Sequence, residues 1–225
     1  MKPFTPNHRL RRWLGGEPPS GDQSQGPDWD GWLLRRMSLG EIVTVGGVLV
    51  DRAVLRQRFA CVAERCAPRS GRGPWRSCCA DVEVALDASE HRRLSRVRRE
   101  LPQGWEGEGC LARPSGRCAL SQIDRAGQIR CVLHCLARER GVDRSEIQPL
   151  SCRLFPLIVV DFGEGRCALT LVSKTTHRLV GAFPPPRYPC LSDDRLPPLP
   201  EALKGDLDWA FGKGFARALD RVRKA

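Results

Sequence analysis

The sequence predicts an α+β fold, a small mixed domain with irregular cysteine-rich loops organised around a metal or iron–sulfur site. Short runs of β-branched and apolar residues alternate with short helical patterns, which is typical of a small mixed domain. Eleven cysteines stand in a chain of 225 residues, many of them beside stretches rich in Gly, Pro and Arg. The length favours one domain with a sizeable core, together with tails.

Composition divides the chain into three parts. Residues 1–36 are rich in Pro and Gly, and we expect a flexible tail, because such a stretch buries too little apolar surface to offset its ordering entropy. Residues 37–195 hold every cysteine and are expected to form the cysteine-cluster metal-binding domain. Residues 196–225 predict a C-terminal amphipathic helix, whose apolar stripe runs from Glu201 to Lys224. This helix is expected to pack on the domain or on a partner.

The first ordered elements are expected to be a hairpin and a helix. Apolar and β-branched residues surround Gly46 and Gly47 in residues 42–50, which predicts two strands joined by a tight turn. Asp51 is placed to cap a helix that runs to Phe59 and delivers Cys61 to the site.

The middle of the chain predicts further short elements. They are a strand at residues 82–86, a helix at 87–100 capped by Asp87 or Ser89, and a helix at 129–140. Two strands follow at residues 157–162 and 166–172, with a glycine-rich turn between them. Pro156 cannot donate a ladder hydrogen bond, so the first of these strands is expected to begin at a sheet edge or a bulge.

Four cysteines lie close together in residues 59–81: Cys61, Cys66 and the adjacent pair Cys78 and Cys79. Thiolates are soft ligands, and several of them together suit zinc or an iron–sulfur cluster. The adjacent pair resists a mutual disulfide because the ring that it would close is strained. No export signal is visible, so the chain is expected to stay in the reducing cytoplasm, where disulfides rarely persist. An odd number of cysteines also argues against a pure disulfide framework.

The helix expected at residues 129–140 carries three more candidate ligands on one face: Cys131, His134 and Cys135. His134 is either a ligand or a hydrogen-bonded core residue, and Cys135 is either a ligand or a small core residue. Both alternatives stay open from the sequence, as does the role of Cys190.

The charge of the chain is strongly positive, with a formal net charge of +11 and a pI of about 9.5. Only five of the 37 basic residues are lysines, and richness in Arg, Ala, Gly and Pro also fits a GC-rich genome. We therefore expect the arginine face formed by Arg92, Arg96 and Arg99 to make only non-specific contacts with nucleic acid. No apolar run is long enough for a bilayer, so no membrane association is expected, whereas a protein partner stays open.

Six short motifs occur in order between residues 46 and 162. They are Phe59-Ala60-Cys61, Cys66, Cys78-Cys79, Cys118-Ala119-Leu120, Cys131-Val132-Leu133-His134 and Pro149-Leu150-Ser151-Cys152-Arg153-Leu154-Phe155-Pro156. Together they resemble the YkgJ-type family of zinc- or iron-chelating cysteine-cluster proteins. The chain departs from that family in the longer gap between Cys66 and Cys78, and in Gln148, where a Lys is common.

The resemblance implies a set of seven cysteine ligands. They are Cys61, Cys66, Cys78, Cys79, Cys118, Cys131 and Cys152. Cys110, Cys135 and Cys167 have no counterpart, so ligand status does not extend to them. Seven thiolates are more than one tetrahedral zinc needs. Either two sites share them, or a multi-iron cluster takes four and leaves the others around it, and iron–sulfur is slightly favoured over zinc.

The expected function is a metal-binding protein that holds zinc or an iron–sulfur cluster. One alternative is a cluster-dependent enzyme that modifies a protein side chain, because a branch of the resembled family is similar to the flagellin lysine N-methylases. The other is a zinc-type nucleic-acid-binding module. The sequence lacks a Ser/His/Asp arrangement, a phosphate loop and a paired-carboxylate motif, so it indicates no particular reaction.

Overall fold

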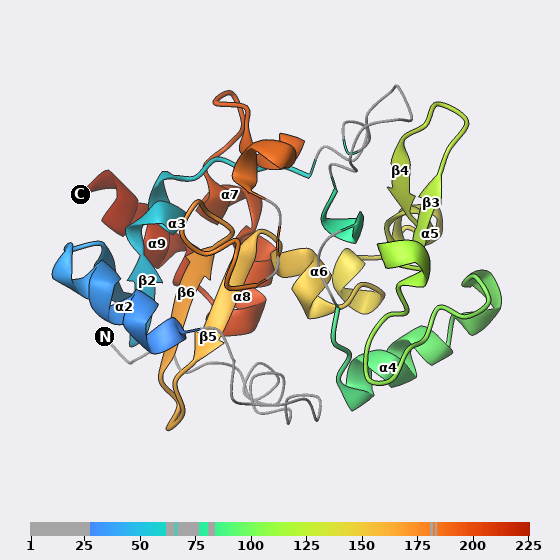
Figure 1. Ribbon diagram of the computed structural model, residues 1–225, viewed down its shortest axis with the longest axis horizontal. Helices are drawn as coiled ribbons and strands as arrows, with labels where there is room; N and C mark the ends of the chain where they lie inside the picture. The colour runs from blue at the N-terminus through green and yellow to red at the C-terminus, as the bar shows by residue number, and fades with distance from the viewer. Residues whose placement is uncertain (1–27, 62–65, 67–76, 81–83, 181, 183) are drawn as a thin grey trace. The chain divides into compact units, whose positions relative to one another are not determined.

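The structure, a computed structural model, describes residues 28–61, 66, 77–80, 84–180, 182 and 184–225 (Figure 1). The chain forms two compact units. Unit 1 comprises residues 1–60, 154–180 and 193–225, and unit 2 comprises residues 61–153 and 181–192. Both contain helices and short strands, so the predicted α+β class is confirmed. The unit boundaries fall inside the expected domain at 37–195.

Unit 1 is built on a four-stranded sheet with the order β1-β2-β6-β5. Its strands are β1 (Ile42–Val45), β2 (Val48–Asp51), β5 (Leu157–Asp161) and β6 (Cys167–Leu171). The predicted hairpin is present as the antiparallel pair β1 and β2, and Gly46 and Gly47 both have the positive φ that a tight hairpin turn requires. The second predicted pair is antiparallel β5 and β6, with β5 at the sheet edge as Pro156 indicates. The two hairpins join through parallel pairing of β2 with β6.

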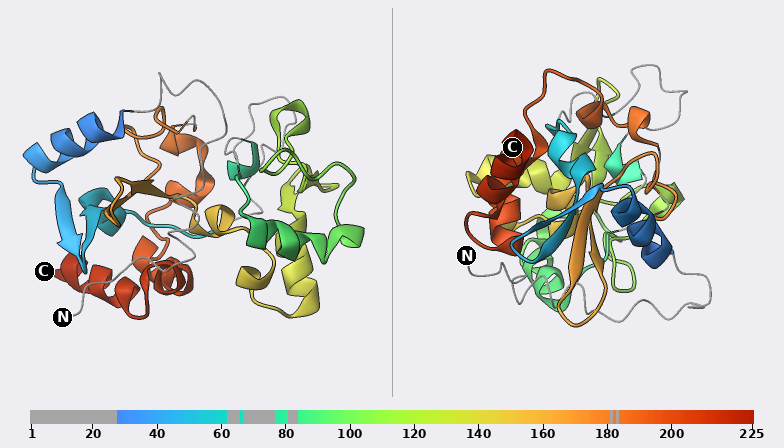
Figure 2. Two further views of the ribbon diagram at one scale, coloured as in Figure 1. Left: turned by 90° about the horizontal axis from the view of Figure 1, so that it is seen from below. Right: turned by 90° about the vertical axis from the view of Figure 1, so that its left-hand side faces the viewer.

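Helices cover both faces of this sheet (Figure 2). Helix α2 (Trp29–Ser38) lies on one face, where Trp32 packs with Val160 and Ala168. Helices α3 (Arg52–Arg56), α7 (Leu199–Ala202), α8 (Lys204–Phe211) and α9 (Phe215–Lys224) lie on the other. The core of unit 1 therefore sits on both sides of β2 and β6.

Helix α2 corrects the expected tail at residues 1–36. Asp28 accepts a hydrogen bond from the backbone N–H of Gly31 at 2.8 Å and so caps the helix, and the buried Trp32 supplies the apolar anchor. The Pro- and Gly-rich composition of residues 1–36 predicted a tail although the Asp28 cap and the apolar Trp32 favour a helix. Residues 1–27, which make up the rest of the expected tail, lie outside the described residues.

The single helix predicted from Glu201 to Lys224 is also corrected, because three helices occupy that stretch. Gly212 and Gly214 have φ values of 106° and 92°, which interrupt the helical backbone between α8 and α9. Across the break, the rings of Phe211 and Phe215 stack with centroids 4.6 Å apart. Tertiary packing of two short helices thus replaces one long amphipathic face.

Unit 2 consists of short helices, 3-10 turns and one small antiparallel sheet. Its elements are η3 (Cys78–Ala80), α4 (Ala88–Ser95), η4 (Arg98–Glu100), η5 (Pro114–Gly116), β3 (Ser121–Ile123), β4 (Ile129–Cys131), α5 (Val132–Arg140), η6 (Arg144–Glu146), α6 (Leu150–Leu154), η7 (Pro185–Arg187) and η8 (Pro189–Leu191). The last residue of α6, Leu154, is assigned to unit 1. One apolar core includes residues of α4, α5 and the segments between residues 97 and 120, and Leu94, Leu120 and Leu133 are among its most buried side chains. No helix in the described parts of either unit is long and apolar enough to cross a membrane.

Several predicted elements of the chain are shorter than expected. The helix predicted from Asp51 to Phe59 is α3, which ends at Arg56, and the helix predicted at 87–100 is α4 followed by the η4 turn. Residues 129–131 form β4 rather than helix, because they pair with β3. Of the strand predicted at 82–86, residues 82 and 83 lie outside the described residues, and Ala85 makes an isolated bridge with Cys110.

A buried carboxylate organises unit 1. Asp51, only 1% exposed, accepts hydrogen bonds from the Arg36 guanidinium at 2.6 Å and from the Thr170 hydroxyl at 2.9 Å. It also caps α3 by accepting from the backbone N–H of Ala53 at 2.9 Å. One side chain therefore links α2, β2, α3 and β6.

We predict that Asp51→Ala lowers the free energy of unfolding by about 3 kcal/mol, because it leaves the Arg36 charge without its buried partner and removes a helix cap. Chemical denaturation measures this loss. Asp194→Ala, which truncates an exposed aspartate of the same unit, should change stability by less than about 0.5 kcal/mol. Equal stability of the two variants would contradict the organising role of Asp51.

Candidate metal centre

All seven cysteines implied as ligands lie in unit 2. Cys118 is buried and Cys61 is exposed, and the other five are half-buried. Cys167 lies in β6 of unit 1, apart from this set. All eleven cysteines are among the described residues, and none forms a disulfide bond.

Four of the seven belong to one apolar core, and we call them the inner thiol group: Cys79, Cys118, Cys131 and Cys152. Cys79 lies in η3, and its carbonyl accepts a hydrogen bond from the backbone N–H of Cys118 at 2.8 Å. Cys131 ends β4 and is the N-cap residue of α5, and Cys152 lies in α6. Four separate segments thus deliver the four thiols to one core.

Burial makes these thiols resist ionisation. It raises the pKa of Cys118 to about 11 and that of Cys131 to about 12, and it raises the pKa of Cys152 well above its ordinary value. Neighbouring thiols add to each shift. Cys79 raises the pKa of Cys118, Cys79 and Cys118 raise that of Cys131, and all three raise that of Cys152. The four thiols therefore lie within electrostatic reach of one another.

Cys79 is the exception, because its pKa is lowered to about 7. A hydrogen bond from the Cys78 thiol is the main cause, burial opposes it, and the Ser77 hydroxyl helps to stabilise the thiolate. The positive charge of Arg117 adds a smaller stabilising contribution. Cys79 is therefore the member of the inner thiol group that favours the form in which sulfur binds metals.

The other three implied ligands are grouped with Cys190, whose role the sequence left open. We call these four residues the outer thiol group: Cys61, Cys66, Cys78 and Cys190. The pKa of Cys78 is raised by its hydrogen bond to Cys79, by burial, and by the neighbouring Cys66 and Cys190. Burial raises the pKa of Cys190, and Cys66 and Cys61 add to the shift. Cys190 lies on η8, in the segment 181–192 that belongs to unit 2. Its separation along the chain left no local signal of this proximity.

A buried polar network borders the inner thiol group. The side-chain amide of Gln148, a residue 5% exposed, donates to the Cys131 sulfur at 3.8 Å. The Arg93 guanidinium donates to the backbone carbonyl of Gln148 at 3.3 Å. Glu90, 4% exposed, accepts from the backbone N–H of Leu150 at 2.7 Å, at the start of the helix that carries Cys152. The network thus connects α4 to two of the four thiols.

The sequence left the roles of His134 and Cys135 open. Both are half-buried on α5. Burial lowers the pKa of His134, and the charges of Arg144 and Arg138 lower it further, so the imidazole is neutral at pH 7. A hydrogen bond from the backbone N–H of His134 lowers the pKa of Cys131, so His134 contacts the inner thiol group through its backbone.

The thiols are near one another but not in coordinating positions. Among the described residues, no three side chains of His, Cys, Asp or Glu lie close enough together to hold a metal ion. Zinc–sulfur bonds are about 2.3 Å long, so the thiols would have to close around a metal for four of them to bind it. The donor set therefore has the chemistry of a metal centre but, among the described residues, not the coordinating geometry.

Comparison of the chain with known protein families, with characterised proteins and with solved structures finds no match. The interpretation of this site therefore depends on its residues and their surroundings.

We predict that Glu90→Gln gains stability relative to the wild type as the pH rises. Burial raises the pKa of Glu90 from 4.5, so the folded state holds this proton more tightly than the unfolded state does. The contribution of Glu90 is therefore fully present below pH 4.5 and is lost as the pH rises through the folded-state pKa. The uncharged amide can still accept from Leu150 and does not suffer this loss.

Thermal unfolding of both proteins between pH 4.5 and pH 8 measures the difference. Glu108→Gln, which changes an exposed carboxylate of the same unit, serves as the control. Glu90→Ala should cost about 1–3 kcal/mol at every pH, because the Leu150 N–H loses its partner. A stability difference between Glu90→Gln and the wild type that does not vary with pH would contradict the role of the buried carboxylate.

Proposed function

We propose that unit 2 binds zinc or an iron–sulfur cluster through the inner thiol group, Cys79, Cys118, Cys131 and Cys152. The observation that supports this most is that four thiols from four segments share one apolar core, in which Cys79 raises the pKa values of the other three. Four thiolates are the ligand set of many structural zinc sites and of iron–sulfur clusters. The resemblance to zinc- or iron-chelating cysteine-cluster proteins points to the same chemistry.

A bound cation would resolve the electrostatic conflict in this core. Burial favours the neutral thiol, but metal binding requires the thiolate, and a cation stabilises the thiolate strongly enough to displace the proton. Cys79 already favours ionisation and would be the first ligand to bind. Gln148 would then donate its N–H to the Cys131 thiolate, and hydrogen bonds of this kind orient metal ligands and tune their basicity.

The division of the cysteines favours two sites over one. Cys78 and Cys79 are adjacent in the η3 turn, yet Cys78 is influenced by Cys66 and Cys190, whereas Cys79 influences Cys118, Cys131 and Cys152. Two groups of four thiols would accommodate all seven implied ligands together with Cys190. The inner thiol group is the better supported of the two, because backbone hydrogen bonds and a shared core also hold it together.

We predict that Cys79→Ala and Cys152→Ala each lose most of the metal bound by the inner thiol group, since three thiolates leave a tetrahedral site incomplete. Elemental analysis for zinc and iron, with acid-labile sulfide, on anaerobically purified protein measures the loss and identifies the metal. Cys190→Ala should reduce the metal content only in part if the outer thiol group is a second site.

Cys110→Ala and Cys167→Ala are the matched controls and should keep the wild-type metal content. Cys167 lies in unit 1, and Cys110 belongs to neither thiol group. Equal metal content in Cys79→Ala, Cys152→Ala and the two controls would refute the assignment of the inner thiol group.

We also predict that removing the metal under reducing conditions unfolds much of unit 2 and leaves unit 1 intact. The inner thiol group joins η3, the residues before β3, β4 and α6, so metal binding energy would also be folding energy for this unit. Hydrogen exchange should show lost protection in α4 and α5 but not in β6 or α9. Unchanged protection in α5 would show that the core of unit 2 folds without the metal.

A further inference from the structure

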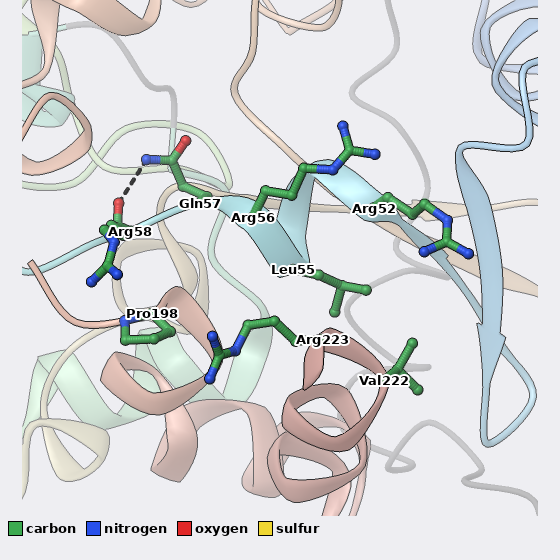
Figure 3. A pocket seen from close by; sticks show the side chains of 8 residues that line it. All are labelled: Arg52, Leu55, Arg56, Gln57, Arg58, Pro198, Val222 and Arg223. Atoms are coloured by element: carbon green, nitrogen blue, oxygen red, sulfur yellow. Dashed lines mark hydrogen bonds between the residues drawn. The ribbon is translucent and has the colours of Figure 1, made fainter. Parts of the chain in front are cut away.

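Unit 1 contains a cavity of about 380 Å³ whose lining is rich in arginine (Figure 3). The residues that line it are Arg52, Leu55, Arg56, Gln57, Arg58, Pro198, Val222 and Arg223. Half of them are arginines, and none of these described lining residues carries a carboxylate. We call this cavity the arginine pocket.

Backbone hydrogen bonds hold the walls of the arginine pocket. The N–H of Phe59 donates to the Pro197 carbonyl at 3.0 Å, and the N–H of Leu199 donates to the Gln57 carbonyl at 2.9 Å. These bonds attach the segment after α3 to the segment before α7, and α3 also packs against α9. The cavity is therefore built from paired backbone and packed helices rather than from loose side chains.

Two of the four arginines bind only uncharged acceptors among the described residues. Arg52 donates to the Gly40 carbonyl at 3.2 Å, and Arg58 donates to the Leu196 carbonyl at 2.6 Å. Such hydrogen bonds hold a guanidinium in place but leave its charge unbalanced. A guanidinium is charged at any physiological pH, so each of the two side chains brings a full positive charge to the pocket.

The other two arginines have carboxylate partners that are shared with further cations. Arg56 pairs with Glu41 at 2.5 Å, and Arg36 lies 3.6 Å from the same carboxylate. Arg223 pairs with Asp220 at 2.6 Å, and so does Lys224.

Counted together, the four arginines of the pocket with Arg36 and Lys224 are six cations. They face three carboxylates, those of Glu41, Asp220 and Asp51, because Arg36 also binds Asp51. The excess is therefore three positive charges. The carboxyl end of α9 offsets about half a charge through the helix dipole, and the five-residue α3 offsets less, which leaves an excess of more than about two.

We propose that the arginine pocket binds a small ligand that carries at least two phosphate groups, of the chemical class of a nucleoside diphosphate. The guanidinium fork matches phosphate oxygens in geometry and charge. Figure 3 shows Arg58 and Arg223 beside Pro198 at one end and Arg52 towards the other, so the positive charge is spread along the cavity. An anion with separated charges fits this spread better than one phosphate does. Leu55, Pro198 and Val222 offer apolar surface to the uncharged part of the ligand.

Calorimetric titration of the full chain tests this proposal, with inorganic pyrophosphate and inorganic phosphate as the probes. Pyrophosphate should bind at least tenfold more tightly than phosphate, and its affinity should fall as ionic strength rises. Arg52→Ala and Arg58→Ala should each weaken pyrophosphate binding about tenfold or more, with circular dichroism unchanged. The pyrophosphate affinity of Arg58→Lys should lie between those of Arg58→Ala and the wild type, because lysine keeps the charge but lacks the forked guanidinium.

Arg166→Ala is the control, because Arg166 is an exposed arginine of unit 1 that does not line the pocket, and it should bind like the wild type. The proposal is overturned if the wild type does not bind pyrophosphate, or if all three alanine variants bind it equally. A lower melting temperature of Arg52→Ala and Arg58→Ala with unchanged affinity would also overturn it, since these arginines would then only cap helices and loops. The pocket belongs to unit 1 and contains no cysteine, so its test is independent of the proposed metal centre.

Discussion

The burial of ionisable sulfur in an apolar core is the constraint on which unit 2 depends. Burial and mutual repulsion hold the thiols of Cys118, Cys131 and Cys152 in their neutral form. A cation that draws the four sulfurs of the inner thiol group together would stabilise their thiolate forms and displace the protons. The proposed metal centre follows from this balance rather than from a coordinating geometry already in place.

Unit 1 handles buried charge in the opposite way. The Asp51 carboxylate is satisfied within the protein by Arg36, Thr170 and the first turn of α3. Such a network leaves nothing for a ligand to supply, so Asp51 has a structural role. The arginine pocket differs, because its positive charge exceeds the carboxylates that surround it. The two proposed ligand sites therefore differ in kind, because one depends on buried sulfur and the other on unbalanced positive charge.

Local signals predicted the strands of unit 1 well, because a glycine-rich turn and an edge proline each fix the backbone within a few residues. Local signals failed where tertiary packing determines the secondary structure. Trp32 anchors a helix in a stretch whose composition indicated a tail, and Gly212 and Gly214 divide a pattern that indicated one helix. Residues 129–131 became a strand because β3, which precedes them in the chain, was available to pair with them. Such outcomes depend on partners that periodicity along one segment does not contain.

The sequence by itself determined the α+β class, the clustering of thiols between Cys61 and Cys152, and the kind of metal that thiols would suit. Those properties depend on residue type and short-range spacing. Only the tertiary structure decided that Cys79 influences the pKa values of Cys118, Cys131 and Cys152, while Cys66 and Cys190 influence that of Cys78. It also brought Arg52 and Arg58 to one cavity with Arg223. These pairings join residues far apart in the chain, and their proximity arises from the packing of whole elements, which no local spacing encodes.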